Sequence, residues 1–535
     1  MARPRRTSAP LSTASHSAAL NAARRTRELD ELGTSAHPLD VLVIGGGVTG
    51  AGVALDAASR GLRVALVEAH DLAFGTSRWS SKLVHGGLRY LATGDIATAR
   101  ESARERHLLL TTIAPHLIRS LPQLLPFTPV VSGRQRFFGT LGMGLGDGLR
   151  MLAGTRAATL APPRLISAQR AYELAPALNA DGLRGGVVSH DGQLVDDARL
   201  VVAIARTAAA FGARILTRVR ATHIAGDGAT VEDTLTGETL RLRARSVINA
   251  TGVWAGTLDD GIRVRPSRGT HIVLDAARLG SPSAALMVPH PGSISRFVFA
   301  LPQQLGRVIV GLTDEDAPGS VPDVALPTEA EIDFLLTTLS SVLESPLDRT
   351  DVRGTFAGLR PLVETTESAA SGSSADVSRR HLTRVGEDGV IAILGGKLTT
   401  YRAMAQDAVD RACAEYDLPA QPCVTPRLPL VGAPGSPIRV NQSTATAPPP
   451  SVVARFGTEA AAVFATASCA RPTDAIVDGL DITRAEIDFA VSHEGALDAG
   501  DVLDRRTRIG LVRDDRGRAE DTVSSLVDEA LAKWS

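Results

Sequence analysis

The first residues in the chain that point to a ligand are glycines that follow an apolar run near the N-terminus. Gly45, Gly47 and Gly50 have the spacing GxGxxG and come directly after the apolar stretch 41–44. A turn of small residues lets the backbone approach a phosphate, and the helix that follows offers N–H groups and a partial positive charge at its start. The stretch therefore predicts a nucleotide site that binds a pyrophosphate.

An acidic residue closes the βαβ unit that this turn begins. After the turn we expect a helix over Ala51–Arg60, a stop at Gly61 and a strand over Arg63–Val67 that ends at Glu68. In this order the acid can accept hydrogen bonds from an adenosine ribose. The alternative is that Glu68 is a solvated acid at the end of a strand.

Two later segments repeat the pattern of a strand followed by a small-residue turn. The first has a strand over Ser246–Asn249 and the turn Ala250, Thr251 and Gly252, and the second runs from Gly389 to Ala412 around Gly395 and Gly396. A nicotinamide domain needs one such turn near its start. FAD is longer and needs distant parts of the chain to close over its ring end, so the repeated turns favour FAD over NAD.

Polar side chains crowd the stretch from Ser80 to Asp95. Gly86 and Gly87 would let the backbone approach a planar ring, and Ser81 and Lys82 could bind diphosphate or ribityl oxygens. His85 faces a ligand or is a core histidine that bonds to the backbone, and both interpretations stay open.

Taken together, these segments resemble the FAD-dependent glycerol-3-phosphate dehydrogenase family. The resemblance runs from about residue 40 to 415 and is carried by VIGGGVTGAG, Glu68, GTSRWSSKLVHGGLRYL, VDDARL, NATGVWAG, SRGTHIVL, GLTD, GLRPLV and LGGKLTTYR. The C-terminal stretch VLDRRTRIGL resembles the closing helical domain of that family. The family resemblance implies oxidation of sn-glycerol 3-phosphate to dihydroxyacetone phosphate, with hydride passing from C2 to FAD and electrons leaving to a membrane quinone.

Other functions remain as alternatives. The nearest is a glycerol-3-phosphate oxidase that passes electrons to O₂ and releases H₂O₂. A flavin-binding regulatory protein without turnover and an amino-acid oxidase are further alternatives, although a monocarboxylate substrate would not need as many basic groups.

A phosphate monoester carries close to two negative charges and calls for convergent arginine or lysine side chains. Arg89, Arg360, Arg379 and Lys397 come from separate motifs and are candidate substrate ligands, and the resemblance adds Tyr90. A surface ion pair is the alternative for Arg379. Lys397 lies at the start of a helix, where it could instead stabilise negative charge on the flavin.

Oxidation of an alcohol also requires removal of its hydroxyl proton, for which a neutral imidazole is suited. His271 is the predicted base, with His85 in reserve, and Arg360 and Lys397 complete the predicted catalytic set. The resemblance implies a larger set of cofactor-binding residues: Gly45, Gly46, Gly47, Thr49, Gly50, Glu68, Thr76, Ser77, Ser81, Lys82, His85, Gly86, Ala250, Thr251, Gly252, Gly395, Gly396, Lys397, Leu398 and Thr399.

Composition excludes several classes of function. A net charge of -1 and 4% aromatic residues speak against binding of nucleic acid. Cys413, Cys423 and Cys469 lack the spacing of a disulfide framework or a zinc site, so we expect no metal and a reducing cytosol.

The sequence also bears on the membrane. No apolar run approaches the roughly 18–20 residues that span a bilayer. Residues 134–156 mix apolar side chains with arginines. This composition predicts either a segment that lies on anionic lipid or a buried loop of the substrate domain. We expect a cytoplasmic protein peripherally associated with the inner face of the plasma membrane, with a homodimer as a possible assembly.

The predicted fold class is α/β and α+β. It combines a discontinuous Rossmann-like FAD-binding domain, an antiparallel-sheet substrate domain and a helical C-terminal domain. The expected boundaries are a disordered tail over 1–38, an FAD-dependent oxidoreductase region over 39–430 (FAD-binding about 39–130, 185–264 and 350–415; substrate domain about 265–349), a linker over 431–451 and the helical domain over 452–535.

Overall fold

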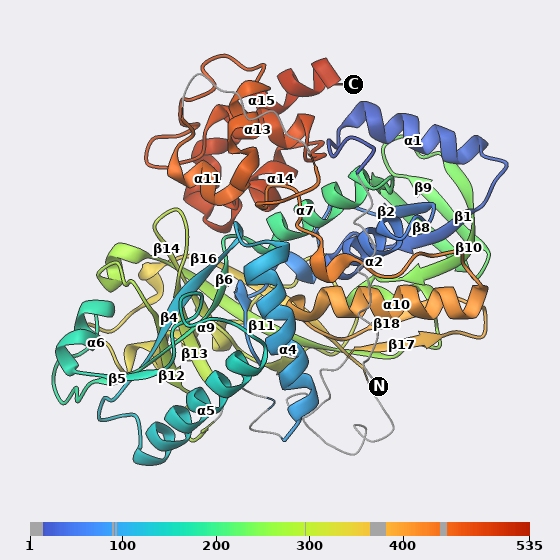
Figure 1. Cartoon of the computed structure of the whole chain (residues 1–535). Helices are drawn as coiled ribbons and strands as arrows, with labels where there is room; N and C mark the ends of the chain where they lie inside the picture. Colours follow the sequence, from blue (N-terminus) through green and yellow to red (C-terminus); the bar gives the residue numbers. More distant parts are fainter. Residues whose placement is uncertain are drawn as a thin grey trace.

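Two β-sheets and a helical C-terminal domain form the protein (Figure 1). The computed structural model describes residues 14–87, 90, 94–294, 296–363, 381–438 and 447–534. The chain passes from the first sheet to the second and back again, so each sheet is built from separate parts of the sequence.

The first sheet is the predicted FAD-binding sheet, and its centre is parallel. Eight strands of this sheet lie in the described part of the chain, and β1 pairs in parallel with both β2 and β10. All residues of β1 are buried, as expected for a strand covered on both faces. Its strands are β1 (Leu39–Ile44), β2 (Val64–Glu68), β7 (Arg214–Thr217), β8 (Val219–Ala225), β9 (Gly228–Asp233), β10 (Thr239–Asn249), β17 (Leu382–Val385) and β18 (Ile391–Leu394).

Helices rich in alanine pack beside this sheet. Helix α2 (Val48–Ser59) contacts both α7 (Asp197–Ala210) and α10 (Tyr401–Tyr416). Almost every residue of α2 is buried, and its small side chains allow this close packing. Helix α2 starts at Val48, earlier than the predicted Ala51, because Gly47 already occupies the N-cap.

The second sheet, as far as its residues are described, has ten strands and is mixed, since β4 and β12 pair in parallel while its other pairs are antiparallel. The predicted limits of the substrate domain, about 265–349, are therefore too narrow. Strands β4, β6 and β16 belong to this sheet, whereas the sequence predicts them in FAD-binding segments. The prediction fails because the alternation of apolar and polar residues along a strand is the same in either sheet. The strands are β3 (Leu83–Val84), β4 (Ile118–Pro126), β5 (Arg164–Ile166), β6 (Gly186–Leu194), β11 (Val264–Asp275), β12 (Ala285–Pro289), β13 (Phe297–Pro302), β14 (Arg307–Gly311), β15 (Glu315–Asp316) and β16 (Val352–Val363).

The N-terminal region contains an ordered helix, so the predicted disordered tail is wrong for residues 14–38. Helix α1 (Ala22–Thr34) buries Leu29 and Leu32 against the first sheet. Its Arg25 forms a buried ion pair of 2.6 Å with Asp233. The segment has few large apolar residues, but those few lie on one helix face. Residues 1–13 lie outside the described part.

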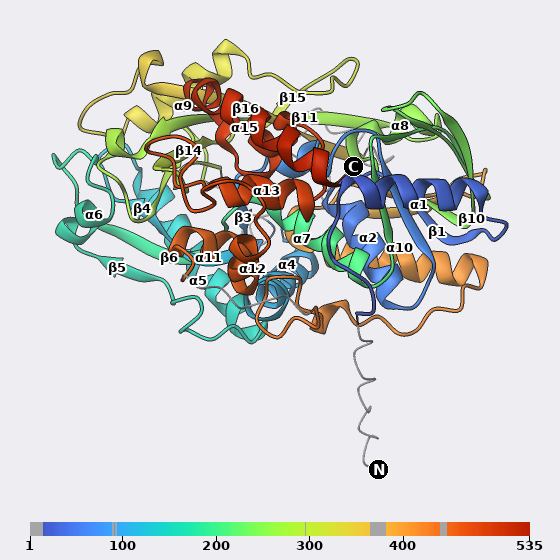
Figure 2. The same cartoon turned by 90° about the horizontal axis from the view of Figure 1, so that it is seen from above.

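The C-terminal domain is helical and contacts α1, α7 and strand β16 of the second sheet (Figure 2). Buried ion pairs join it to the first sheet region, among them Arg506 to Asp71 at 2.9 Å. The predicted linker is described at 431–438 and 447–451, and its start packs in the core, where Val431 is buried. The helices are α11 (Pro450–Phe456), α12 (Ala460–Ala465), α13 (Arg484–Ser492), α14 (Ala499–Asp501) and α15 (Arg513–Trp534).

Candidate active site

A cavity of about 910 Å³ is lined by residues from both sheets. Its size is within the range of roughly 300–1,000 Å³ that is usual for ligand sites. The three small-residue turns predicted from the sequence all contribute to its wall: 45–49, 250–252 and 395–399, with Gly46 excepted. The structure therefore brings these distant segments together.

The turn between β1 and α2 forms one part of the wall. Gly47 is the N-cap of α2, and the N–H of Val48 donates to Ser77 Oγ at 2.9 Å. Gly50 does not line the cavity. A Cβ atom at Gly50 would lie 1.9 Å from the carbonyl oxygen of Gly45, so its role is to let strand and helix pack closely. This arrangement fits a pyrophosphate at the helix N-terminus.

Glu68 lines the cavity beside this turn. Its carboxylate accepts hydrogen bonds from the N–H groups of Gly46 at 2.6 Å and His70 at 2.9 Å. Burial raises the pKa of Glu68 despite these two bonds. Gly46 is turned toward the acid and not toward the cavity. His70 stacks on Phe74 at 3.8 Å, and both line the cavity, although the sequence had not marked them.

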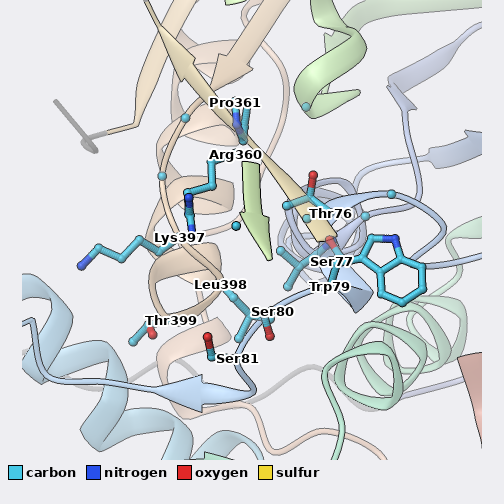
Figure 3. Close-up of a pocket in the computed structure, with 18 of the residues that line it drawn as sticks. Thr76, Ser77, Trp79, Ser80, Ser81, Arg360, Pro361, Lys397, Leu398 and Thr399 are labelled. Carbon is cyan, nitrogen blue, oxygen red and sulfur yellow. The ribbon is translucent and has the colours of Figure 1, made fainter. Parts of the chain in front are cut away.

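Thr76, Ser77 and Ser81 approach the cavity from the segment after β2 (Figure 3). The hydroxyl of Thr76 donates to the carbonyl of Leu359 on β16 at 2.6 Å, which ties this segment to the second sheet. In the same view Arg360 and Lys397 lie to the left of Thr76 and Ser77, and Ser81 lies below them (Figure 3). The predicted cofactor residues Leu398 and Thr399 also line the cavity.

His271 lies on β11 at the cavity wall and is only 2% exposed. Its Nε2 lies 2.8 Å from Ser81 Oγ, and its ring stacks on Phe356 of β16 at 4.6 Å. Burial, together with the nearby charges of Arg360 and Lys82, lowers the pKa of His271 to about 3. The imidazole is therefore neutral at physiological pH.

Arg360 reaches the cavity from β16 and is held by residues of the GLTD segment. Its Nη1 lies 3.0 Å from Asp314 Oδ1 and 3.2 Å from Ser267 Oγ, and its Nη2 donates to the Thr313 carbonyl at 3.2 Å. The side chain is still 23% exposed. The sequence identified Arg360 but not the part that Asp314 plays in holding it.

Lys397 and Tyr90 meet at the cavity wall. The ammonium lies 3.7 Å from the centre of the Tyr90 ring and 3.0 Å from Ser102 Oγ. A cation over an aromatic face is attracted to it. The two predicted substrate ligands are thus in contact with each other, and both line the cavity.

Some predicted residues lie elsewhere. Lys82 is not among the residues that line the cavity, and its ammonium is buried in an ion pair of 2.9 Å with Asp197. Gly86 lies behind the wall, where its N–H donates to Asp191 at 3.3 Å. His85 does line the cavity. Arg89 and Arg379 fall outside the described residues.

Helix α5 (Gly133–Leu152) lines the outer part of the cavity, at the edge of the molecule opposite the C-terminal domain (Figure 1). The segment is a helix despite its glycines, so a buried loop is excluded as its structure. Ser132 and Gln135 form a capping box at its start. Its large exposed apolar side chains are Phe137, Phe138, Leu141, Leu145, Met151 and Leu152.

Two further features bear on the site. Among the described residues, no group of histidine, cysteine and acidic side chains is arranged to hold a metal ion. Within the same part of the chain, no helix combines the length and the apolar character needed to cross a membrane.

Family models match most of the chain. The model described as FAD dependent oxidoreductase matches residues 40–402. The model described as C-terminal domain of alpha-glycerophosphate oxidase matches residues 423–535. Among known proteins, glycerol-3-phosphate dehydrogenase 1 of Mycobacterium tuberculosis is 56% identical over 503 residues, which are 94% of this chain and 97% of that protein.

Two solved structures of flavoproteins are also similar to this chain. The glycerol-3-phosphate dehydrogenase of Bacillus halodurans, solved in complex with FAD, has a TM-score of 0.73 and 25% identity, and the match covers 96% of this chain and 94% of that one. L-alpha-glycerophosphate oxidase of Mycoplasma pneumoniae, with FAD bound, has a TM-score of 0.54 and 20% identity over 74% of this chain and 99% of that one, and shares the fold.

Proposed function

The chain belongs to the FAD-dependent glycerol-3-phosphate dehydrogenase family, and on that premise we propose that it oxidises sn-glycerol 3-phosphate to dihydroxyacetone phosphate and passes the electrons to a membrane quinone. The observation that carries the substrate proposal is the pair Arg360 and Lys397, which line one cavity with the three glycine turns. Two cations beside a flavin site suit a substrate with a doubly anionic phosphate.

FAD is the cofactor of this family, and the residues present fit it. The turn 45–49 at the start of α2 would hold the pyrophosphate, and Glu68 the adenosine ribose. Segments 250–252 and 395–399 would hold the ring end. When bound, FAD supplies the two-electron acceptor that takes the hydride from C2 of the substrate.

Arg360 and Lys397 bind and orient the substrate phosphate in this proposal. Arg360 is pre-oriented by Asp314, so little side-chain freedom is lost when the phosphate arrives. Lys397 is a compact charge held against the face of Tyr90. With the phosphate fixed, the C2 hydroxyl can be presented to the other side chains of the wall.

His271 accepts the proton of the C2 hydroxyl. Its low pKa keeps the imidazole unprotonated, and the contact with Ser81 and the stack on Phe356 fix the ring. His85, which also lines the cavity, is the reserve for this role.

Helix α5 supports contact with the membrane. Phe137, Met151 and Leu152 are 64%, 61% and 75% exposed, and Arg134 and Arg156 at its flanks are exposed as well. Apolar side chains beside basic ones suit a surface that lies on anionic lipid. The same helix lines the cavity, so attachment there would bring the site close to a lipid-soluble quinone on the cytoplasmic face.

The absorbance spectrum of the purified protein tests the reaction. Bleaching of the flavin bands by glycerol 3-phosphate in the absence of air supports the proposal, and an unchanged spectrum contradicts it. Oxygen consumption without added quinone would instead identify an oxidase, and would overturn the quinone part of the proposal alone.

A further inference from the structure

The C-terminal domain reaches the back of the active-site wall through the segment Val502–Leu511, which includes a turn at Arg508. Arg508 has a φ of 66° and is 4% exposed. Its Nη2 donates to the carbonyl of Arg78 at 2.6 Å, and its Nε lies 3.0 Å from Asp196 Oδ2. The guanidinium also lies 5.4 Å from the centre of the Trp79 ring. One arginine of the C-terminal domain therefore touches the segment that leads to Ser81.

Asp197, the first residue of α7, links Arg508 to the residues on either side of Ser81. Its side chain is fully buried, and Nη2 of Arg508 lies 3.9 Å from its Oδ1. Its Oδ2 accepts hydrogen bonds from the backbone N–H of Ser80 at 3.0 Å and from the Ser80 hydroxyl at 2.7 Å. Its Oδ1 binds the ammonium of Lys82 at 2.9 Å. The residues before and after Ser81 are thus both attached to one carboxylate.

Ser81 is the residue between these two attachment points, and its hydroxyl contacts the imidazole of His271 at 2.8 Å. The opposite face of this region is fixed as well. Val512 packs in one cluster with Phe356, on which His271 stacks. The backbone at Gly354 leaves no room for a Cβ beside the carbonyl of Leu511. The C-terminal domain therefore supports both neighbours of the His271 ring.

We propose that Arg508 is a positioning residue for the reaction: through Asp196, Asp197 and the Arg78 carbonyl it fixes residues 80–82, so that Ser81 holds the imidazole of His271 in its reactive orientation. This inference rests on the proposed function of His271 as the base. It gives the C-terminal domain a part in catalysis, although none of the residues described in that domain lines the cavity.

Kinetics of the flavin-loaded protein test the proposal. We expect R508M to slow flavin reduction by substrate at least about tenfold, because small misplacements of a catalytic group have effects of this size or larger. The KM should stay the same, because Arg360 on β16 and Lys397 in the turn 395–399 lie outside residues 78–82, which Arg508 supports. The matched control is R455M, which removes a buried arginine of the C-terminal domain that pairs with Glu486 at 2.6 Å, and it should keep the normal rate.

A double-mutant cycle separates positioning from general destabilisation. If Arg508 acts through Ser81, the variant S81A/R508M should be no slower than the slower of the two single variants. The proposal would be overturned if the rate loss in S81A/R508M equalled the product of the losses in the two single variants. A normal rate in R508M would also overturn it. If R508M does not fold, R508K serves in the same cycle, because it keeps the charge but cannot reach both aspartates and the carbonyl together.

A readout without turnover keeps this inference distinct from the proposed function. Protein labelled with ¹⁵N-histidine reports the hydrogen bonding of the His271 ring by NMR. We expect R508M to shift the His271 signals in the same direction as S81A does, while R455M leaves them in place. Unmoved His271 signals in R508M would contradict the proposal even if the substrate were oxidised normally, and a shift would support it even if the substrate were another alcohol.

Discussion

Arg360 and Asp314 form an ion pair of 3.0 Å at the wall of the cavity, with the carboxylate buried and the guanidinium partly open to the cavity. We expect R360M to lower kcat/KM for glycerol 3-phosphate by about 10- to 100-fold, the range for loss of a hydrogen bond to a charged group. The carboxylate left behind would also repel the phosphate. Steady-state kinetics measure the effect.

The matched control for this change is R265M. Arg265 lies on β11, pairs with Asp316 near the surface and does not itself line the cavity. Its kcat/KM should equal that of the unchanged protein. Equal losses in R360M and R265M would remove Arg360 from substrate binding.

His271 is proposed as the base, so its loss should affect the chemical step. We expect H271N to slow flavin reduction by at least about 100-fold, the low end for general base catalysis. Asparagine keeps a polar group near Ser81 but cannot accept the proton. Stopped-flow absorbance without air measures this rate, and an unchanged trace would exclude His271 from the role.

The pKa of His271 also predicts how stability depends on pH. In the folded protein the pKa is lowered to about 3, whereas an unfolded histidine titrates near 6.5. The unfolded chain therefore binds the proton first, and this residue lowers the free energy of unfolding as the pH falls from about 6.5 toward 3, by on the order of 1 kcal/mol per pH unit.

Removal of the imidazole should abolish this contribution. The free energy of unfolding of the unchanged protein should fall relative to that of H271N on acidification, while above about pH 7 the difference between the two should be constant. Denaturant titrations at several pH values measure it. A difference that does not change with pH would contradict a lowered pKa at His271.

Gly50 has no room for a side chain, because a Cβ there would lie 1.9 Å from the Gly45 carbonyl. We expect G50A to lower the free energy of unfolding by about 1–3 kcal/mol, the usual penalty for overpacking. Because the turn beside Gly50 is part of the flavin site, the variant should also retain less flavin. The control is G517A in α15, where a Cβ meets nothing within 4 Å and helix propensity should add up to about 1 kcal/mol. Urea unfolding and the flavin-to-protein absorbance ratio after desalting decide between these outcomes.

Helix α5 should control attachment to lipid. The triple variant F137S/M151S/L152S removes exposed apolar side chains that do not line the cavity. Each loss removes about 1 kcal/mol or more of transfer free energy, so binding to anionic liposomes should fall at least about tenfold. Anaerobic bleaching by substrate should stay normal.

The control for this variant is L165S/L326S, which removes exposed leucines elsewhere, 69% and 74% exposed. It should sediment with liposomes as the unchanged protein does. If all three proteins sediment equally, α5 is not the membrane contact.

Much of the cofactor site could be predicted because its chemistry is local. Gly45 has a φ of 107° and Gly50 abuts a carbonyl, so glycine is required at both positions and marks the turn in the sequence. Glu68 follows from its place at the end of β2. Such residues can be recognised from spacing alone, since the element that positions each one is its neighbour in the chain.

Residues that depend on distant partners could not be predicted. Lys82 pairs with Asp197, a contact across 115 positions, and no local pattern distinguishes it from a lysine that faces a ligand. The same holds for Asp314, which lies in the loop between β14 and β15 and pairs with Arg360 of β16 across 46 positions. The predicted limits of the substrate domain are wrong for a related reason. A half-buried strand alternates apolar and polar residues in the same way whichever of the two sheets it joins, so the sequence does not show which sheet β4, β6 and β16 belong to.

The alternation of the chain between the two sheets has a consequence for synthesis and for engineering. On the ribosome, the second sheet is incomplete until β16 has emerged at Val363, and the first until β18 has emerged at Leu394, so the flavin pocket closes only late in translation. A chimera that exchanges one sheet with a relative would have to transplant several separate pieces, whereas the C-terminal helices from Pro450 onward form one continuous piece, whose exchange would need matching partners for Arg506 and Arg508.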